Sequence, residues 1–469
     1  MKHSDDIQNF FFLGIGGIGM SALARYFHHC GYSVAGYDRT PSPLTDELKE
    51  EGIAVVFEDD PSVFDFQFAL FNPKHTMVVR TPAVPEENAI YTFLREKGYQ
   101  IRKRAEVLGM VTRQKKALCV AGTHGKTTTS TMLAHLLYQS ELGANAFLGG
   151  ISVNYGTNLL LQKDCSYVVV EADEYDRSFH HLTPYMSVVT AVDPDHLDIY
   201  GTPEAYREAF AHYTSLISKT LVMKHGIALE PRLQKGCKCY TYGVLSDDQR
   251  PTTNDQRPDF YADNIRIQKG QIRFDFHTPT VTMPDLQLGV PVWVNIENSV
   301  AAMAVAWLNG VTDDELRRGI ASFRGVQRRF NIHVHTSRVA YIDDYAHHPE
   351  EIATSIDSIR RLFPERRLIG VFQPHLYTRT RDFAEGFKQV LGTLDECILL
   401  PIYPAREEPI PGITSEILGG TVIEKKDLVK VLKDKVQSTK EPLVILTVGA
   451  GDIDRLVPEI TKTLKSLNE

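Results

Sequence analysis

Two glycine-rich turns constrain the fold of this chain more than any other feature of its sequence. Each turn follows a short apolar run and precedes a segment with helical periodicity, first at residues 14–19 and again at residues 122–125. A strand, a tight glycine turn and a helix together form the start of a βαβ unit, which requires a parallel sheet. The sequence therefore predicts α/β domains, with each glycine turn at the edge of a sheet.

The length of 469 residues suits about three domains of ordinary size. A third series of alternating apolar and helical segments begins after Phe330. We expect three domains, at residues 1–113, 114–330 and 331–469. The predicted fold class is α/β, with a Rossmann-like N-terminal domain, a P-loop-type central domain with a mainly parallel sheet, and a Rossmann-like C-terminal domain. Within the central domain, residues 246–259 predict a loop and residues 265–276 a hairpin.

The remaining elements follow from the same periodicities. Thr312 and Glu315 have the spacing of a capping box, and Gly310 is placed to end the preceding helix. Helices are expected at residues 127–138, 296–309 and 313–322. Strands are expected at residues 10–13, 32–37, 117–121, 167–170, 187–192, 339–342, 368–372, 397–401 and 443–448.

Charge and cysteine content exclude several classes of protein. Lys and Arg number 51 against 59 Asp and Glu, a formal net charge of −8, and no basic run is dense enough to bind nucleic acid. The six cysteines form no CxxC pair, which indicates a reducing compartment. Residues 10–24 are apolar but contain four glycines, so they predict neither a signal peptide nor a membrane span. We expect a cytoplasmic protein without a membrane partner, whose oligomeric state the sequence does not predict.

The first glycine turn satisfies the GxGxxG pattern, and Asp38 follows nineteen residues after its last glycine. Such spacing is typical of dinucleotide-binding folds, in which the acidic residue binds a ribose. The glycines let any diphosphate approach a helix N-terminus, so the turn alone does not decide between NAD and another diphosphate. The candidate residues are Gly14, Gly16, Gly17, Gly19 and Asp38.

The second turn resembles a phosphate-binding P-loop, although Val120 occupies the position of its first glycine. Lys126 is placed to reach the β- and γ-phosphates of ATP, and Thr127 to bind Mg²⁺. Glu171 and His196 follow two successive strands, so both are expected at the same sheet edge as further metal ligands. The candidate ATP-binding residues of the loop are Gly122, Thr123, His124, Gly125, Lys126, Thr127 and Thr128.

Together with GVQRRF, DDYAHHP and FQPHLYTRTRDF further on, these motifs resemble the Mur ligases over essentially the whole chain. The resemblance implies that the first domain binds a UDP-sugar rather than NAD, the second ATP and magnesium, and the third an amino acid. The pattern is closest to the branch that joins L-alanine to UDP-N-acetylmuramate. The branch that attaches a preformed tripeptide remains an alternative, as do an NAD-dependent oxidoreductase and a non-catalytic nucleotide-binding protein.

The resemblance also implies roles for individual residues. Lys126 would contact the terminal phosphates, and Thr127, Glu171 and His196 would bind the metal. Arg329 would face the nucleotide phosphates, Asn295 and Asn298 the adenine, and His375, Arg379 and Arg381 the amino-acid carboxylate, while His347 or His348 would accept the proton of the amine. Two positions depart from the family pattern: Val294 replaces a histidine and Leu376 an arginine.

Overall fold

The computed structural model describes residues 7–245, 257–268, 270–405 and 407–467. It divides into two compact units. The first comprises Met1–Asn264, Phe274–Leu286 and Glu297–Phe323, and the second comprises Ile265–Arg273, Gln287–Ile296 and Arg324–Glu469. Most of the predicted loop at residues 246–259, and Lys269 of the predicted hairpin turn, lie outside the described residues.

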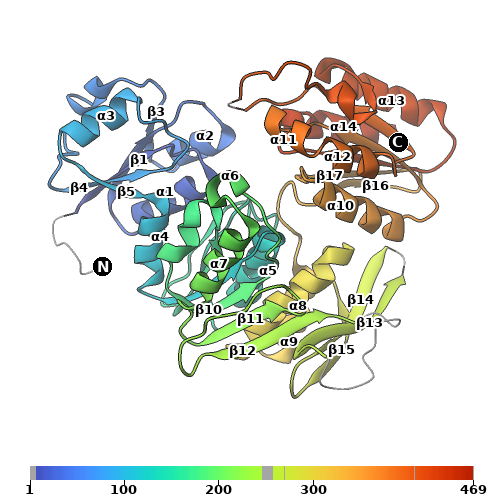
Figure 1. The fold of residues 1–469 in the computed structure, drawn as a ribbon, viewed down its shortest axis with the longest axis horizontal. Coiled ribbons are helices and arrows are strands. Elements are labelled where there is room, and N and C mark those ends of the chain that lie inside the picture. Colours follow the sequence, from blue (N-terminus) through green and yellow to red (C-terminus); the bar gives the residue numbers. More distant parts are fainter. Residues whose placement is uncertain (1–6, 246–256, 269, 406, 468–469) are drawn as a thin grey trace. The chain divides into compact units, whose positions relative to one another are not determined.

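The N-terminal sheet lies in the part of the chain drawn in blue in Figure 1. It contains five parallel strands in the order β3-β2-β1-β4-β5. β1 is central because its sequence, NFFFL, is apolar after the first residue and buried at all five positions. The strand order reverses beside β1, which places the first glycine turn at the switch point of the sheet. The strands are β1 (Asn9–Leu13), β2 (Ser33–Tyr37), β3 (Ala54–Val56), β4 (Thr76–Arg80) and β5 (Gln100–Lys103), and the helices are α1 (Ile18–His29), α2 (Pro43–Glu50), α3 (Ala89–Glu96) and α4 (Arg104–Thr112).

The central sheet has ten strands in the order β15-β14-β13-β12-β11-β10-β6-β9-β7-β8. Its middle strands are parallel, and the short β7–β8 pair is antiparallel. The strands are β6 (Lys116–Ala121), β7 (Asn145–Phe147), β8 (Leu159–Leu160), β9 (Tyr167–Ala172), β10 (Pro184–Val189), β11 (Thr220–Lys224), β12 (Lys238–Val244), β13 (Phe260–Gln268), β14 (Gln271–His277) and β15 (Thr282–Gln287). The helical segments are α5 (Lys126–Tyr138), the 3₁₀ segment η2 (Tyr175–His181), α6 (Leu197–Tyr200), α7 (Pro203–Thr214), α8 (Trp293–Leu308) and α9 (Asp313–Ser322).

The C-terminal sheet has six strands in the order β16-β17-β21-β18-β19-β20, parallel except for the β16–β17 pair. The three sheets together form a three-domain α/β fold of mainly parallel sheets, as the sequence predicted. The strands are β16 (Asn331–His335), β17 (Val339–Asp344), β18 (Arg367–Phe372), β19 (Glu396–Leu399), β20 (Thr421–Val422) and β21 (Leu443–Val448). The helices are α10 (Pro349–Leu362), α11 (Tyr377–Asp382), α12 (Ala384–Leu391), α13 (Leu428–Ser438) and α14 (Val457–Ser466).

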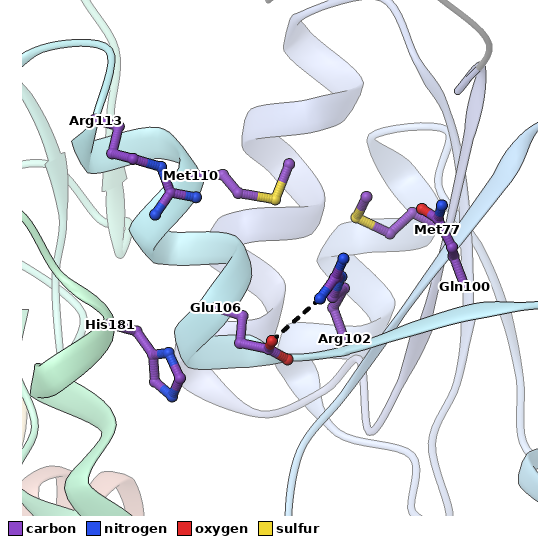
Figure 2. Close-up of a pocket in the computed structure, with 7 residues that line it drawn as sticks. All are labelled: Met77, Gln100, Arg102, Glu106, Met110, Arg113 and His181. Carbon is purple, nitrogen blue, oxygen red and sulfur yellow. Dashed lines mark hydrogen bonds and ion pairs between the residues drawn. The ribbon is translucent and has the colours of Figure 1, made fainter. Parts of the chain in front are cut away.

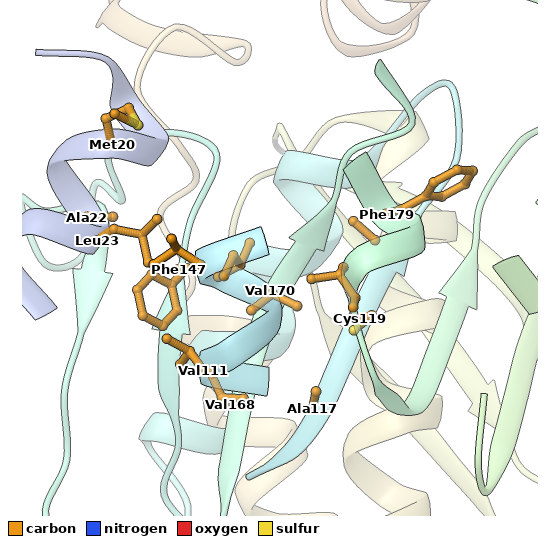
Figure 3. Packing of buried hydrophobic residues seen from close by; sticks show 14 of the residues in the cluster. Met20, Ala22, Leu23, Val111, Ala117, Cys119, Phe147, Val168, Val170 and Phe179 are labelled. Atoms are coloured by element: carbon orange, nitrogen blue, oxygen red, sulfur yellow. The ribbon is translucent and has the colours of Figure 1, made fainter. Parts of the chain in front are cut away.

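One apolar cluster joins the N-terminal and central sheets within the first unit. Figure 3 shows Leu23 of α1 beside Phe147 of β7, with Val168 and Val170 of β9 in the same cluster. The rings of Tyr26 and Phe147 lie 5.3 Å apart. Burial of this apolar surface stabilises the two sheets together, because the side chains of each exclude water from the other.

A buried arginine reinforces the same junction. Arg25 is 8% exposed, pairs with Glu47 and Glu51 at 2.8 and 2.7 Å, and donates a hydrogen bond to Asn158 Oδ1 at 2.8 Å. Asn158 in turn donates to the carbonyl of Ile18 at 2.6 Å. These contacts satisfy the charge of Arg25 away from water and connect α1 to the central domain.

Several element boundaries differ from the sequence prediction. β9 continues through Glu171 because its backbone pairs with Val120 of β6, so this carboxylate lies within the strand rather than after it. β10 ends at Val189 instead of residue 192, and β17 extends to Asp344 instead of residue 342. The capping box of Thr312 and Glu315 at α9 is confirmed. No helix in the described part of the chain is long and apolar enough to cross a membrane.

Candidate functional site

The first glycine turn connects β1 to α1 and is held by the neighbouring strand. The backbone N–H groups of Gly14 and Ile15 donate to the carbonyl of Tyr37 at 2.7 and 3.0 Å. Gly14 has a φ of 85°, a conformation that glycine adopts without strain. The N–H groups of the first α1 turn face the carboxyl end of the sheet, the position at which such folds bind phosphate.

Asp38 stabilises this turn directly. Its Oδ2 accepts a hydrogen bond from the N–H of Gly16 at 2.8 Å, and its Oδ1 accepts one from Thr40 at 3.1 Å. A Cβ at Gly16 would lie 2.9 Å from Asp38 Oδ2 and 2.8 Å from Thr45 Cγ2. Glycine at position 16 is therefore what allows the carboxylate to approach the backbone. The sequence placed Asp38 at the site but did not predict this contact.

The second glycine turn connects β6 to α5. Gly125, at the N-terminus of α5, has a φ of 78°, and a Cβ there would lie 2.8 Å from Asn298 Oδ1. Asn298 also accepts a hydrogen bond from Thr129 at 3.2 Å. Thr123 of the same turn bonds to the hydroxyl of Tyr206 at 2.9 Å. The structure thus brings Asn298 of α8 to the second turn, although Asn298 lies 172 residues after Lys126, the first residue of α5.

Lys126 lies over this turn and pairs with a carboxylate that the sequence analysis did not single out. Its Nζ is 2.8 Å from Glu174 Oε1 and 2.7 Å from the carbonyl of Gly122. The side chain of Glu174 is 2% exposed and that of Lys126 is 14% exposed. Burial alone would lower the pKa of Lys126, but the negative charges of Glu174 and Glu171 outweigh burial and raise it. Lys126 is therefore a fixed positive charge at the turn.

Two of the predicted metal ligands, Thr127 and Glu171, contact each other. Thr127 donates a hydrogen bond to Glu171 Oε1 at 3.2 Å, and a Cβ at Gly149 would lie 1.9 Å from Glu171 Oε2. Gly149 therefore leaves the space that the carboxylate occupies. A hydroxyl beside a carboxylate fits Mg²⁺, which prefers oxygen ligands and keeps several waters or phosphate oxygens. The described residues contain no group of three His, Cys, Asp or Glu side chains that would hold a metal by itself.

His196 contacts an aspartate and a tyrosine. Its Nε2 is 3.7 Å from Asp195 Oδ2, and its ring packs edge-on against Tyr175 at 5.1 Å. It precedes α6 with a φ of 53°, an uncommon conformation for a residue with a side chain. Such strain is often found at functional positions, because the surrounding structure must maintain it.

Two of the predicted site histidines, His347 and His375, lie near each other in the C-terminal domain. The rings of His347 and His375 lie 6.3 Å apart, and His375 stacks on Tyr403. His347 donates its backbone N–H to Glu351 at 3.0 Å. Burial lowers the pKa of His347, which favours the neutral imidazole that a proton acceptor requires. His348 is the N-cap residue of α10, and its ring packs against Phe383.

The two predicted carboxylate-binding arginines have different surroundings. Arg381 is 51% exposed and pairs with its neighbour Asp382 at 2.7 Å. The guanidinium of Arg379 makes no hydrogen bond or ion pair with any residue that the structure describes, and its charge, in addition to burial, lowers the pKa of His347. Of the two, Arg379 is the one with free donors beside the histidines.

Arg328 and Arg329 also differ. Arg328 donates to the carbonyls of Gly449 and Gly451 and pairs with Asp454 at 3.1 Å. Arg329 lies over the ring of Tyr345, 4.9 Å from its centroid, and among the described residues its guanidinium has no hydrogen-bond partner. Arg328 therefore has a structural role, and Arg329 remains available for a ligand. Asn295, in the first turn of α8, is buried near the carbonyl of Val290.

Two buried carboxylates that the sequence did not predict as site residues lie at the end of β17. Burial raises the pKa of Asp343 to about 7 and also raises that of Asp344. Their place at the carboxyl end of a buried strand that pairs in parallel with β21, in the DDYAHHP motif, was the available signal.

A cavity of about 430 Å³ opens between β4, β5, α4 and η2 and contains none of the predicted site residues. Figure 2 shows Arg102 paired with Glu106 on one side and His181 on another. The remaining lining residues are Met77, Gln100, Met110 and Arg113. This cavity is separate from both glycine turns.

Comparison with known proteins identifies three family models along the chain. The model described as "Mur ligase family, catalytic domain" matches residues 9–116, and "Mur ligase middle domain" matches residues 120–306. The model described as "Mur ligase, glutamate ligase domain" matches residues 328–451. The three matches follow one another in the order of the three sheets.

Individual relatives match over nearly the whole length. A UDP-N-acetylmuramate–L-alanine ligase of Phocaeicola vulgatus is 54% identical over 97% of this chain and 97% of its own. A protein of the same name from Parabacteroides distasonis is 55% identical over 97% of this chain and 96% of its own. Among solved structures, UDP-N-acetylmuramate-alanine ligase of Thermotoga maritima superposes with a TM-score of 0.79 at 27% identity, covering 98% of this chain and 99% of that one.

Proposed function

The chain belongs to the Mur ligase family, and we propose that it joins L-alanine to the lactyl carboxylate of UDP-N-acetylmuramate in an ATP-dependent reaction. The product, UDP-N-acetylmuramoyl-L-alanine, is a precursor of peptidoglycan. The observation that carries the proposal is the presence of two glycine turns in one unit, each at the carboxyl edge of its own parallel sheet, where such turns suit phosphate. One turn suits the diphosphate of a sugar nucleotide, and the other suits ATP.

The chemistry requires activation of the carboxylate, because a carboxylate does not react with an amine at neutral pH. The lactyl carboxylate attacks the γ-phosphorus of ATP, which forms an acyl phosphate and releases ADP. The amine of L-alanine then attacks the acyl carbon, the C–O bond to phosphate breaks, and inorganic phosphate leaves. Both steps build negative charge on phosphate oxygens, so fixed positive charges stabilise their transition states.

Residues of both compact units would supply that charge. Lys126 is charged and fixed above the loop, and Arg329 offers a guanidinium without a described partner. Thr127 and Glu171 would hold Mg²⁺, whose chemistry is to offset phosphate charge as a Lewis acid. Asn298 contacts the same turn and would pack near the nucleotide, together with the predicted adenine contact Asn295.

The residues of the C-terminal domain would bind and activate L-alanine. Arg379 has free donors for its carboxylate, and His375 lies close to His347. The amine must lose a proton as the amide bond forms. His347 is our candidate acceptor because its lowered pKa keeps the ring neutral, with His348 next to it in the chain.

The rival functions receive less support. An NAD-dependent oxidoreductase would use the first turn but would leave the Lys126 turn unexplained. The tripeptide-adding activity shares the fold and the nucleotide sugar, but the relatives from Phocaeicola vulgatus and Parabacteroides distasonis, at 54% and 55% identity, carry the name of the alanine-adding enzyme. We also expect the protein to act in the cytoplasm, where its six free cysteines stay reduced.

The deciding experiment measures phosphate release from ATP by the purified chain. Release should require both UDP-N-acetylmuramate and L-alanine, and mass spectrometry should identify the amide product. L-alanyl-γ-D-glutamyl-meso-diaminopimelate in place of L-alanine tests the tripeptide alternative, and a nicotinamide fluorescence titration tests NAD binding. Release that depends on the tripeptide but not on L-alanine would transfer the assignment to the other branch.

A further inference from the structure

We propose that Glu174 is a positioning residue of the ATP site, which pairs with Lys126 at the second turn and releases it to the phosphates of the nucleotide. The inference rests on the proposed function, because it assumes that the second turn binds ATP. It concerns how the lysine reaches the ligand, a step that the loop motif by itself does not describe.

The first argument is the number of donors on Lys126. An ammonium group has three N–H donors. In this structure all three have acceptors: Glu174 Oε1 at 2.8 Å, the carbonyl of Gly122 at 2.7 Å and the carbonyl of Thr123 at 3.5 Å. A phosphate oxygen that binds Nζ must therefore replace at least one of these partners.

The second argument identifies which partner is exchanged. The two carbonyls belong to the turn itself, whereas Glu174 reaches Lys126 from the segment after β9. A phosphate oxygen and the Glu174 carboxylate are both anionic, so they repel each other when they share one buried ammonium group. Exchange of Glu174 for phosphate removes that repulsion and leaves the backbone contacts of the turn in place.

The third argument is the state of the Glu174 carboxylate. Its side chain is 2% exposed, and its Oε2 is buried without a hydrogen-bond partner in the described part of the protein. Its backbone carbonyl accepts a hydrogen bond from the hydroxyl of Tyr200, which fixes the segment. A carboxylate with one unsatisfied buried oxygen is unfavourable, so the ion pair with Lys126 is the main contact that compensates it.

Because the ion pair competes with the nucleotide, its removal should strengthen nucleotide binding. We expect Glu174→Gln to lower the Kd for ADP by about tenfold, because Lys126 is then available to phosphate in a larger fraction of the molecules. The Kd is measured by calorimetry with and without Mg²⁺. The unfolding temperature of the ligand-free variant should fall, because Lys126 loses its charged partner. The temperature rise on adding ADP should be larger than in the original protein.

A neighbouring carboxylate provides the matched control. Asp173 pairs with Arg104 at 3.1 Å and does not contact Lys126 Nζ, so Asp173→Asn should leave the Kd for ADP within about twofold of the original. In a Lys126→Gln background, Glu174→Gln should no longer change ADP affinity, because the competing pair is already absent. Glu174→Asp, which withdraws the carboxylate by one methylene, should also strengthen binding.

A Kd for ADP in Glu174→Gln that equals or exceeds the original value would overturn the proposal and make the residue purely structural. If the variant fails to fold, the structure of the unaltered protein with ADP gives the answer. Lys126 Nζ should then contact a phosphate oxygen and lie beyond the ion-pair limit of about 4 Å from Glu174. A retained ion pair would contradict the proposal. Failure of the proposed function is distinguished by the phosphate-release assay of the unaltered protein, which none of these measurements uses.

Discussion

Leu376 has an unusual backbone conformation for a residue with a side chain. It precedes α11 with a φ of 69°, which is unfavourable for a side chain branched at Cγ, and its N–H donates to the carbonyl of Tyr403 at 3.0 Å. The resemblance to the family places an arginine there. With leucine at this position, only Arg379 and Arg381 remain from the arginines of that segment.

We predict that Arg379, rather than Arg381, binds the alanine carboxylate. Arg379→Ala should raise the KM for L-alanine at least tenfold, because loss of one partner of a desolvated charge pair costs about 2–5 kcal/mol. The KM values for ATP and UDP-N-acetylmuramate should change much less. Arg381→Ala is the matched control, since its guanidinium is exposed and already paired with Asp382. The reverse pattern in steady-state kinetics would assign the carboxylate to Arg381.

Asp343 should give the C-terminal domain a pH-dependent stability. Burial raises its pKa to about 7, so between about pH 4 and 7 the folded protein holds a proton that the unfolded chain has lost. Its contribution to the free energy of unfolding therefore falls as pH rises through that window, by about 1.4 kcal/mol per unit.

The test compares Asp343→Asn with the original protein by calorimetry at pH 5 and pH 8. The amide cannot ionise, so the unfolding temperature of the variant relative to the original should be higher at pH 8 than at pH 5. An equal difference at both pH values would show that Asp343 ionises normally in the folded state.

At the scale of secondary-structure elements, the unit formed by β1, the first glycine turn and α1 depends on close backbone approach. Asp38, at the end of β2, reaches the Gly16 N–H only because position 16 has no Cβ. The turn is therefore shaped by a neighbouring strand as well as by its own glycines. The arrangement presents the α1 N-terminus to the carboxyl edge of the sheet.

Gly16→Val should disrupt this element without affecting the second turn. The new side chain would collide with Asp38 and Thr45 and would also obstruct a diphosphate. We expect the KM for UDP-N-acetylmuramate to rise at least tenfold, about 1.4 kcal/mol or more, while the KM for ATP changes less than twofold. An equal rise in both KM values would indicate general damage to the fold, and micromolar NAD binding lost in the variant would reassign the turn.

At the scale of the whole molecule, the packing groups three sheets into two compact units. The N-terminal and central sheets share one apolar cluster, to which α1 and β9 both contribute, and Arg25 links them further. The C-terminal sheet has a cluster of its own. Residues that share a core unfold together, because exposure of one side of the cluster exposes the other.

Scanning calorimetry should accordingly resolve two unfolding transitions rather than three. UDP-N-acetylmuramate and ADP, each added alone, should raise the same transition, since both glycine turns belong to the first unit. At a ligand concentration of one hundred times Kd the gain is about 2.7 kcal/mol. If the two ligands raised different transitions, the shared core would not unfold as one unit.

The sequence by itself determined the local features of this protein. The turn glycines, the P-loop lysine and the capping box of α9 follow from backbone conformation and short spacing, which depend on adjacent residues only. The α/β fold class follows from periodicity for the same reason. The identities of the candidate ligands also came from the sequence, through motifs that each lie within a few consecutive residues.

Only the tertiary structure decided which side chains meet. It brought Lys126 to Glu174, Gly16 to Asp38 and Gly125 to Asn298. It also showed that Arg381 is paired with Asp382, and that β9 continues through Glu171. The three contacts join residues that are distant in sequence, and the strand continues because its backbone pairs with β6. These outcomes depend on how strands and helices pack, and periodicity in one segment carries no information about its partner in another.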